Sequence, residues 1–75
     1  MAEESIYKIL AQSIGVPQED IEPKHHLIDD LGADSLTTVE IVLSLEEEFD
    51  IDIEDSESEE LFTVQDILDY MKGRL

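Results

Sequence analysis

The chain has 75 residues, of which 21 are Asp or Glu and only four are Lys or Arg, so its formal net charge is −17. Such a surface repels nucleic acid phosphates, which excludes nucleic acid as a partner, disfavours anionic membranes and favours basic protein surfaces. A chain this short forms one small domain, residues 1–75, and without cysteine it has neither disulfides nor thiolate metal sites.

The first predicted helix covers residues 3–14 and ends at Gly15, because Pro17 prevents its continuation. Its apolar face comprises Ile6, Ile9, Leu10, Ser13 and Ile14. A long connection over residues 16–33 follows, and loops of this length in small domains are usually functional or are held by side chains. The side chains that we expect to hold this loop against the core are Val16, Ile21, Leu27, Ile28 and Leu31.

The strongest helical pattern covers residues 35–49, which contain no Pro or Gly and are rich in Leu, Glu, Val and Ile. We expect Asp34 to cap this helix by accepting a hydrogen bond from a free N–H group of its first turn. Ser35 then lies in that turn, beside unpaired N–H groups and the positive end of the helix dipole. A phosphate ester on its hydroxyl would be favourable there, although an Asp-Ser pair before a helix is by itself common capping chemistry.

The same helix has two apolar stripes when its residues are placed at about 100° intervals. The stripe that we expect to face the core comprises Thr38, Ile41, Val42, Leu45 and Phe49. The other stripe comprises Leu36, Val39 and Leu43, and it is bordered by Glu40, Glu46 and Glu47. Either neighbouring helices bury this second stripe, or it forms an exposed ridge that docks on partners with basic residues around an apolar groove. We favour the docking ridge.

A short third helix is expected to begin near Asp55 or Ser56, where Ser56 and Glu59 have the spacing of a capping box. Before it, Ile51 and Ile53 alternate with acidic residues, as in a strand. That alternation is too short to build a sheet, so we expect no strand there.

The fourth predicted helix covers residues 64–72, with Thr63 as its N-cap and Gly73 as its end. Phe62 and Ile67 have the spacing of a hydrophobic staple, which would fix how the chain enters this helix. The sequence therefore predicts an all-α fold, a small four-helix bundle with a long first loop and a short third helix.

Signals for metal binding or catalysis are weak. His25 and His26 have no matching ligands at a diagnostic spacing, so we interpret them as solvated loop histidines. The acidic run at residues 50–55 begins like a calcium loop, but it lacks the glycine at the sixth position and the glutamate at the twelfth. Ser35 has no plausible catalytic triad. We therefore expect no metal site and no catalytic residue.

Residues 31–53 read LGADSLTTVEIVLSLEEEFDIDI and closely resemble the acyl carrier proteins of bacterial-type (type II) fatty acid synthesis. The resemblance extends to IGVPQEDI at residues 14–21 and to FTVQDILDYMKG at residues 62–73, so it covers nearly the whole chain. It implies that Ser35 carries 4′-phosphopantetheine through a phosphodiester, and that the thiol of this arm holds acyl groups as thioesters. It also implies that the acyl chain shelters between the helices, where the expected lining residues are Leu45, Ile53 and Leu61.

The resemblance implies a carrier rather than an enzyme. Its partners would be a phosphopantetheinyl transferase (holo-acyl-carrier-protein synthase) and fatty acid synthesis enzymes with basic docking patches. The expected partner-binding residues are Asp34, Leu36, Val39, Glu40, Leu43, Glu46 and Glu47. Because no secretory signal, transit peptide or membrane-spanning run is visible, we expect a cytoplasmic monomer that does not insert into membranes. Two alternatives are a carrier specialised for another pathway, such as polyketide or lipid A synthesis, and an acidic interaction module that is never modified.

Overall fold

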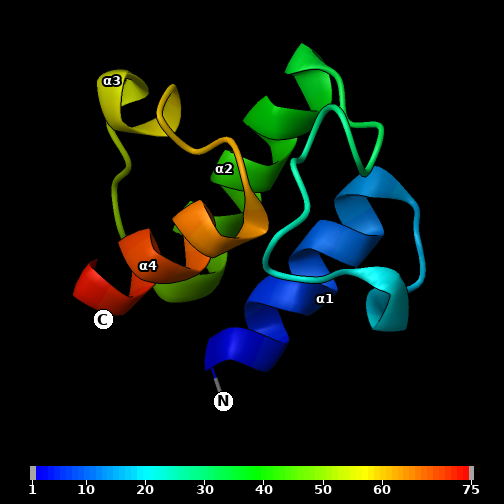
Figure 1. The fold of residues 1–75 in the computed structure, drawn as a ribbon. Coiled ribbons are helices and arrows are strands. Elements are labelled where there is room, and N and C mark those ends of the chain that lie inside the picture. The colour runs from blue at the N-terminus through cyan, green and yellow to red at the C-terminus, as the bar shows by residue number, and fades with distance from the viewer. Residues whose placement is uncertain (1, 75) are drawn as a thin grey trace.

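The computed structural model describes residues 2–74, which form four α-helices joined by loops (Figure 1). The helices are α1 (Ala2–Ile14), α2 (Ser35–Phe49), α3 (Asp55–Ser58) and α4 (Val64–Arg74), and a 3₁₀ turn, η1, covers Gln18–Asp20. In this part of the chain there is no strand, and one isolated bridge joins His26 to Thr63. The predicted all-α architecture is confirmed, including the long first loop and the short third helix.

The ends of the first and last helices show two different uses of glycine. Gly15 has a φ of +88°, the left-handed conformation in which a helix readily stops, so the predicted end of α1 is confirmed. Gly73 does not have a positive φ, and α4 continues through it to Arg74. The predicted stop at Gly73 is therefore wrong. Lys72 and Arg74 instead place positive charge in the last turn, where the helix dipole favours it.

The core is built by one face each of α1, α2 and α4, together with a few loop side chains. Its most deeply buried members include Leu10, Leu45, Val64 and Met71, each with 0% of its surface exposed. Figure 1 shows α3 and the start of α2 at one end of the molecule, opposite the end where the two termini lie. In the described residues no helix is both long and apolar enough to cross a membrane.

The long loop is held to the core by fewer side chains than predicted. Ile21 and Leu27 are buried, and Val16 and Leu31 are half-buried against the core, as expected. Ile28 was expected to do the same, but 48% of its surface is exposed. The chain turns at this point, and the turn directs the Ile28 side chain away from the core.

Backbone hydrogen bonds tie the same loop to the start of α4. The Leu27 amide donates to the Phe62 carbonyl (2.9 Å), and the Val64 amide donates to the His25 carbonyl (3.0 Å). The next amide of α4 donates to the Pro23 carbonyl (2.9 Å). Two segments that lie far apart in the sequence are thereby fixed side by side.

The two loop histidines are partly solvated, as expected, and they also hold the loop together, a role that the sequence did not predict. Both are half-buried. The Nδ1 atom of His25 accepts a hydrogen bond from a backbone amide (3.1 Å), and that of His26 accepts from the amides of Ile28 and Asp29 (3.2 Å each). The His26 ring also stacks on Phe62, with 6.1 Å between the ring centroids. In each case the imidazole nitrogen accepts hydrogen bonds from backbone N–H groups for which the tight loop offers no carbonyl acceptor.

The caps of α3 differ from the prediction. Because α3 begins at Asp55, its N-cap is Glu54, whose amide donates to the Glu57 carboxylate (3.4 Å). The observed capping box pairs Glu54 with Glu57, so the predicted box of Ser56 and Glu59 is wrong by two residues.

The start of α4 follows the predicted cap but not the predicted staple. The Asp66 amide donates to the Thr63 hydroxyl (3.0 Å), and the Asp66 carboxylate accepts from the amides of Thr63 and Phe62 (3.0 Å each). Thr63 is thus confirmed as the N-cap. Phe62 packs on His26 and leaves 54% of its surface exposed, so its predicted pairing with the buried Ile67 is wrong.

Candidate functional site

Ser35 is exposed in the first turn of α2. Asp34, the residue before it, has extended backbone angles, and its Oδ1 accepts a 2.8 Å hydrogen bond from the Thr37 amide. The predicted N-cap is therefore confirmed. The Ser35 carbonyl accepts a 2.8 Å hydrogen bond from the Thr38 hydroxyl, which closes the first turn on its other side. The backbone of Ser35 is fixed while its side chain faces solvent.

The electrostatics of this turn favour a negative group. The Thr37 backbone N–H, which donates to Asp34, holds the pKa of that carboxyl below its usual value. The amides of Ser35 and Leu36 lie among the first N–H groups of a long helix, which have no partner within the helix and carry the positive end of its dipole. A phosphate on the Ser35 hydroxyl would lie at this positive end, beside a carboxylate that already uses the Thr37 amide.

The segment that leads into Ser35 is itself fixed. Gly32 has a φ of +79°, a conformation that glycine adopts without strain, and the chain turns there toward α2. Ala33, the next residue, is buried, and its amide donates to the Leu27 carbonyl (2.9 Å). The loop therefore presents Ser35 in one orientation.

The second apolar stripe of α2 is exposed. Leu36, Val39 and Leu43 leave 67%, 53% and 55% of their surfaces in solvent. By contrast, Ile41 and Leu45, on the first stripe, are almost completely buried. The alternative in which neighbouring helices bury both stripes is therefore wrong. We call Leu36, Val39 and Leu43 the α2 ridge.

The acidic residues around the α2 ridge are not equivalent. Glu40 and Glu47 are exposed. Glu46 is half-buried, and its carboxylate accepts a 2.8 Å hydrogen bond from the Ile53 amide. Sequence reasoning missed this structural role, because a contact between residues seven apart across a loop leaves no trace in helical periodicity.

Comparison with known proteins places this geometry in a family. The family described as "Phosphopantetheine attachment site" matches residues 4–71, which is most of the 75-residue chain. The chain belongs to this family. Its cofactor is phosphopantetheine, and its role is that of a carrier.

One solved structure extends the comparison. It is a protein from Mycobacterium tuberculosis whose own assignment as an acyl carrier protein is provisional. The two chains are 29% identical, the match covers 100% of each, and the TM-score is 0.92. This likeness supports the fold over the whole length of the phosphopantetheine attachment domain.

A cavity of about 210 Å³ lies between α2 and α3, and we call it the α2–α3 cavity. Its apolar lining residues are Val39, Val42, Leu43 and Ile53. Of the three residues expected to line an acyl shelter, Ile53 lines this cavity. Leu45 is fully buried within the core, and the half-buried Leu61 packs against the core instead of facing this cavity. Whether Leu45 and Leu61 line the space that an acyl chain occupies between the helices stays a prediction.

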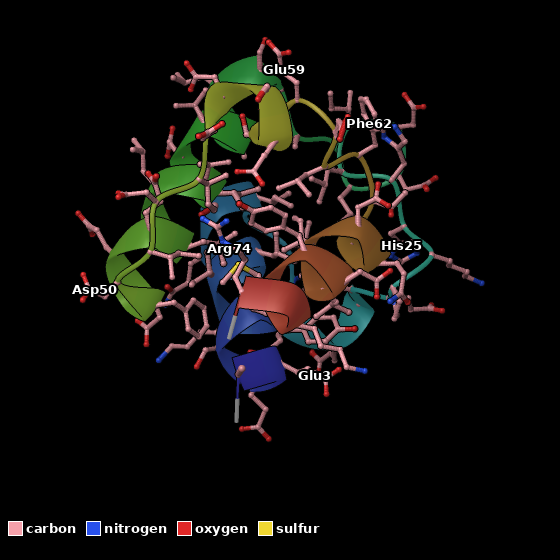
Figure 2. The ribbon with its side chains drawn as sticks, turned by 90° about the vertical axis from the view of Figure 1, so that its left-hand side faces the viewer. Glu3, His25, Asp50, Glu59, Phe62 and Arg74 are labelled. Atoms are coloured by element: carbon pink, nitrogen blue, oxygen red, sulfur yellow. The ribbon has the colours of Figure 1, made fainter. Side chains whose placement is uncertain are left out.

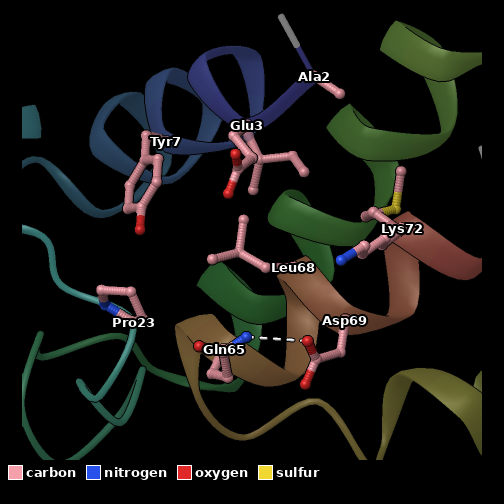
Figure 3. Close-up of a pocket in the computed structure, with 10 residues that line it drawn as sticks. Ala2, Glu3, Tyr7, Pro23, Gln65, Leu68, Asp69 and Lys72 are labelled. Atoms are coloured by element: carbon pink, nitrogen blue, oxygen red, sulfur yellow. Dashed lines mark hydrogen bonds between the residues drawn. The ribbon is translucent and has the colours of Figure 1, made fainter.

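A second cavity, of about 400 Å³, lies between α1 and α4, and α2 contributes nothing to it (Figure 3). Figure 3 places Tyr7 and Leu68 on its two sides and the Lys72 amine at its edge. The Gln65 amide donates to Asp69, four residues further along α4 (2.8 Å). It takes no residue from the first turn of α2. In residues 2–74 no group of three or more His, Cys, Asp or Glu side chains could hold a metal ion.

Proposed function

We propose that this chain is an acyl carrier protein of fatty acid synthesis, in which Ser35 carries 4′-phosphopantetheine and residues 1–75 form a single acyl carrier domain. The observation that carries the proposal is the exposed serine in the first turn of α2, capped by Asp34. The phosphodiester would gain from the helix dipole. The thiol at the end of the bound arm would hold acyl groups as thioesters, which the cysteine-free chain cannot do itself.

Ser35 is favoured over the other five serines by exposure and by its helix. Ser5, Ser13, Ser44 and Ser58 are half-buried, so a modifying enzyme reaches their hydroxyls less easily. Ser56 is exposed, but it lies within a helix of four residues in an acidic run. A phosphate there would meet repulsion from neighbouring carboxylates and little helix dipole to offset it.

The α2 ridge and its acidic border supply the partner surface of this proposal. The proposed partner-binding residues are Asp34, Leu36, Val39, Glu40, Leu43, Glu46 and Glu47. An apolar centre with a charged rim suits transient contact, because the rim guides encounter and the centre supplies contact area. The partners are a phosphopantetheinyl transferase and fatty acid synthesis enzymes with basic docking patches. The chain acts as a cytoplasmic monomer and a cosubstrate, not as a catalyst.

The α2–α3 cavity is the proposed entrance for the acyl chain. It adjoins the ridge through Val39 and Leu43, which line its wall. Its volume of about 210 Å³ accommodates a short chain, so a longer one would need α2 and α3 to separate. Because α3 has only four residues, its separation from α2 costs little packing energy.

The attachment site is tested by loading the unmodified chain. The protein is incubated with coenzyme A and a broad-specificity phosphopantetheinyl transferase, and the modified peptide is mapped by mass spectrometry. We expect one arm per chain, on Ser35. Ser35→Ala should abolish loading, whereas the matched control Ser56→Ala should load like the parent. Modification of any other serine, or none of the parent, would refute the assignment.

The pathway is tested by reconstitution. The loaded chain replaces the native carrier in a purified bacterial fatty acid elongation system, and acyl products on the arm are followed by intact mass. Repeated growth by two carbons is expected. A chain that is loaded with the arm but never elongated would instead point to a carrier for another acyl pathway, such as polyketide or lipid A synthesis.

A further inference from the structure

Two large apolar side chains outside α2 are exposed, and the docking ridge does not account for them. Phe62 leaves 54% of its surface in solvent and Ile28 leaves 48%. Together with the three residues of the α2 ridge, they are the large apolar side chains that the described structure exposes most. Both have the sequence pattern of core residues. We call Ile28 and Phe62 the loop patch.

The loop patch combines segments more than thirty residues apart in the sequence. The Leu27 amide, next to Ile28, donates to the carbonyl of Phe62 itself (2.9 Å). The Ile28 amide donates to the imidazole of His26, and that ring stacks on the Phe62 ring. The two exposed side chains are thus set by one hydrogen-bonded unit. Their exposure is a fixed property of the fold and does not come from a loose loop.

The loop patch is directly connected to the first turn of α2. The Leu27 carbonyl accepts a hydrogen bond from the Ala33 amide (2.9 Å), and Ala33 precedes the N-cap of α2. Ser35 therefore lies in the chain between the loop that carries Ile28 and the helix that carries the α2 ridge.

The surroundings of the loop patch are acidic. Asp29 and Asp30 directly follow Ile28, and Glu59 and Glu60 precede Phe62 by three and two residues. All four are exposed. Figure 2 shows Phe62 and Glu59 at the same end of the molecule, away from Arg74 and Glu3. The loop patch therefore repeats the composition of the α2 ridge, an apolar centre inside an acidic border. Its charge is complementary to a basic protein surface.

We infer that the loop patch is a second docking contact for the phosphopantetheinyl transferase, and that it receives an apolar side chain of that enzyme flanked by Lys or Arg. The inference rests on the proposed function of Ser35. Enzymes that act on the acyl group work at the far end of the arm, whereas the transferase must bring coenzyme A to the Ser35 hydroxyl. An enzyme that encloses this hydroxyl contacts surface on both sides of it.

The test measures transferase kinetics with coenzyme A for the parent and for Phe62→Ser, Ile28→Ser and the double variant. Because truncation of a well-packed interface side chain raises a dissociation constant severalfold, we expect kcat/KM for the carrier to fall roughly five- to twentyfold for Phe62→Ser. The loss should lie in KM, with kcat nearly unchanged. Leu43→Ser on the α2 ridge is the positive control, and Gln18→Ser on η1 is the neutral control.

Phe62→Leu separates surface contact from loop integrity. Leucine keeps an apolar side chain but loses the stack on His26. If the loop patch binds the enzyme, Phe62→Leu retains most of the parental rate. If Phe62 acts only by holding the loop through its stack on His26, Phe62→Leu loses as much of the loading rate as Phe62→Ser. Thermal melting then shows the same loss of stability in both variants.

Direct binding gives a readout without chemistry. Ser35→Ala and the double variant Ser35→Ala with Phe62→Ser are titrated into the transferase by calorimetry, and weaker binding is expected only for the second. Equal binding and equal loading kinetics of Phe62→Ser and the parent would overturn the inference while leaving Ser35 as the attachment site. A parent chain that is never loaded would instead overturn the proposed function.

Discussion

The carboxylate of Glu46 accepts a 2.8 Å hydrogen bond from the amide of Ile53, on the far side of the loop between α2 and α3. This bond fixes a buried loop residue to the helix that also carries the α2 ridge. Ile53, whose side chain is 7% exposed, lines the α2–α3 cavity. The bond therefore sets the position of one wall of that cavity.

The first prediction separates Glu46 from its neighbour. Glu46→Ala leaves the half-buried Ile53 amide without its acceptor, so the free energy of unfolding should fall by about 1–2 kcal/mol. For a domain of this size that corresponds to a melting temperature lower by roughly 5–10 °C. Glu47→Ala, at an exposed position, is the matched control and should change stability by less than about 0.5 kcal/mol. Equal effects of the two substitutions in thermal melting would contradict a specific role for Glu46.

The second prediction concerns the charge border of the ridge. Glu40→Lys should slow association with the transferase by about threefold to tenfold at low salt, because it reverses a charge that guides encounter. Glu19→Lys on η1 makes the same change in net charge away from the ridge and should have a small effect. Stopped-flow association rates at several salt concentrations provide the measurement. Equal slowing by both variants would mean that net charge, and not the ridge border, controls encounter.

The third prediction concerns acid. Because hydrogen bonding to Thr37 lowers the pKa of Asp34 in the folded state, its contribution to stability is present above the ordinary aspartate pKa of about 3.9. That contribution is lost as the pH falls through the lowered folded value. Asn caps helices well but does not titrate, so the melting temperature of Asp34→Asn relative to the parent should rise below about pH 4. An NMR titration that gives Asp34 a pKa at or above the ordinary value would contradict this.

The fourth prediction concerns ionic strength. The chain carries 21 acids against four bases, and the Lys24–Glu22 ion pair of the described residues is exposed (3.6 Å). The acidic side chains therefore repel one another. Raising the salt concentration from 0.01 M to 0.1 M shortens the Debye length from roughly 30 Å to about 10 Å and weakens this repulsion. We expect the melting temperature at pH 7.5 to rise by about 5 °C, and to rise further with millimolar magnesium or calcium. Unchanged melting under both conditions would show that the charges are solvated well enough not to destabilise the fold.

The sequence predicted best where the determining interactions are local. The bounds of α2 and its cap at Asp34 follow from residues within a turn or two of each other. Helical periodicity assigns each residue to a face of the helix. The spacing of capping residues identifies the donor and the acceptor of the capping hydrogen bond. For these features no knowledge of the rest of the fold was needed.

The predictions from sequence were wrong where a segment distant in the sequence determines how a side chain is placed. Phe62 has the spacing of a staple, but His26, thirty-six residues earlier, provides a competing aromatic contact. Ile28 reads as a core residue, but a turn built on the His26 imidazole points it outward. In each case the group that determines the side-chain position cannot be identified from the local sequence pattern.

The hydrogen bonds that join the long loop to the start of α4 run between backbone atoms, from Leu27 to Phe62 and from Val64 to His25. Such bonds do not depend on which side chain a residue carries. Substitutions at positions 28 and 62 therefore leave these backbone bonds in place, while a change at position 62 alters the stack on His26. If the loop patch contacts a partner as proposed, substitutions at these two positions would change which partner is preferred, while the backbone bonds that fix the loop remain.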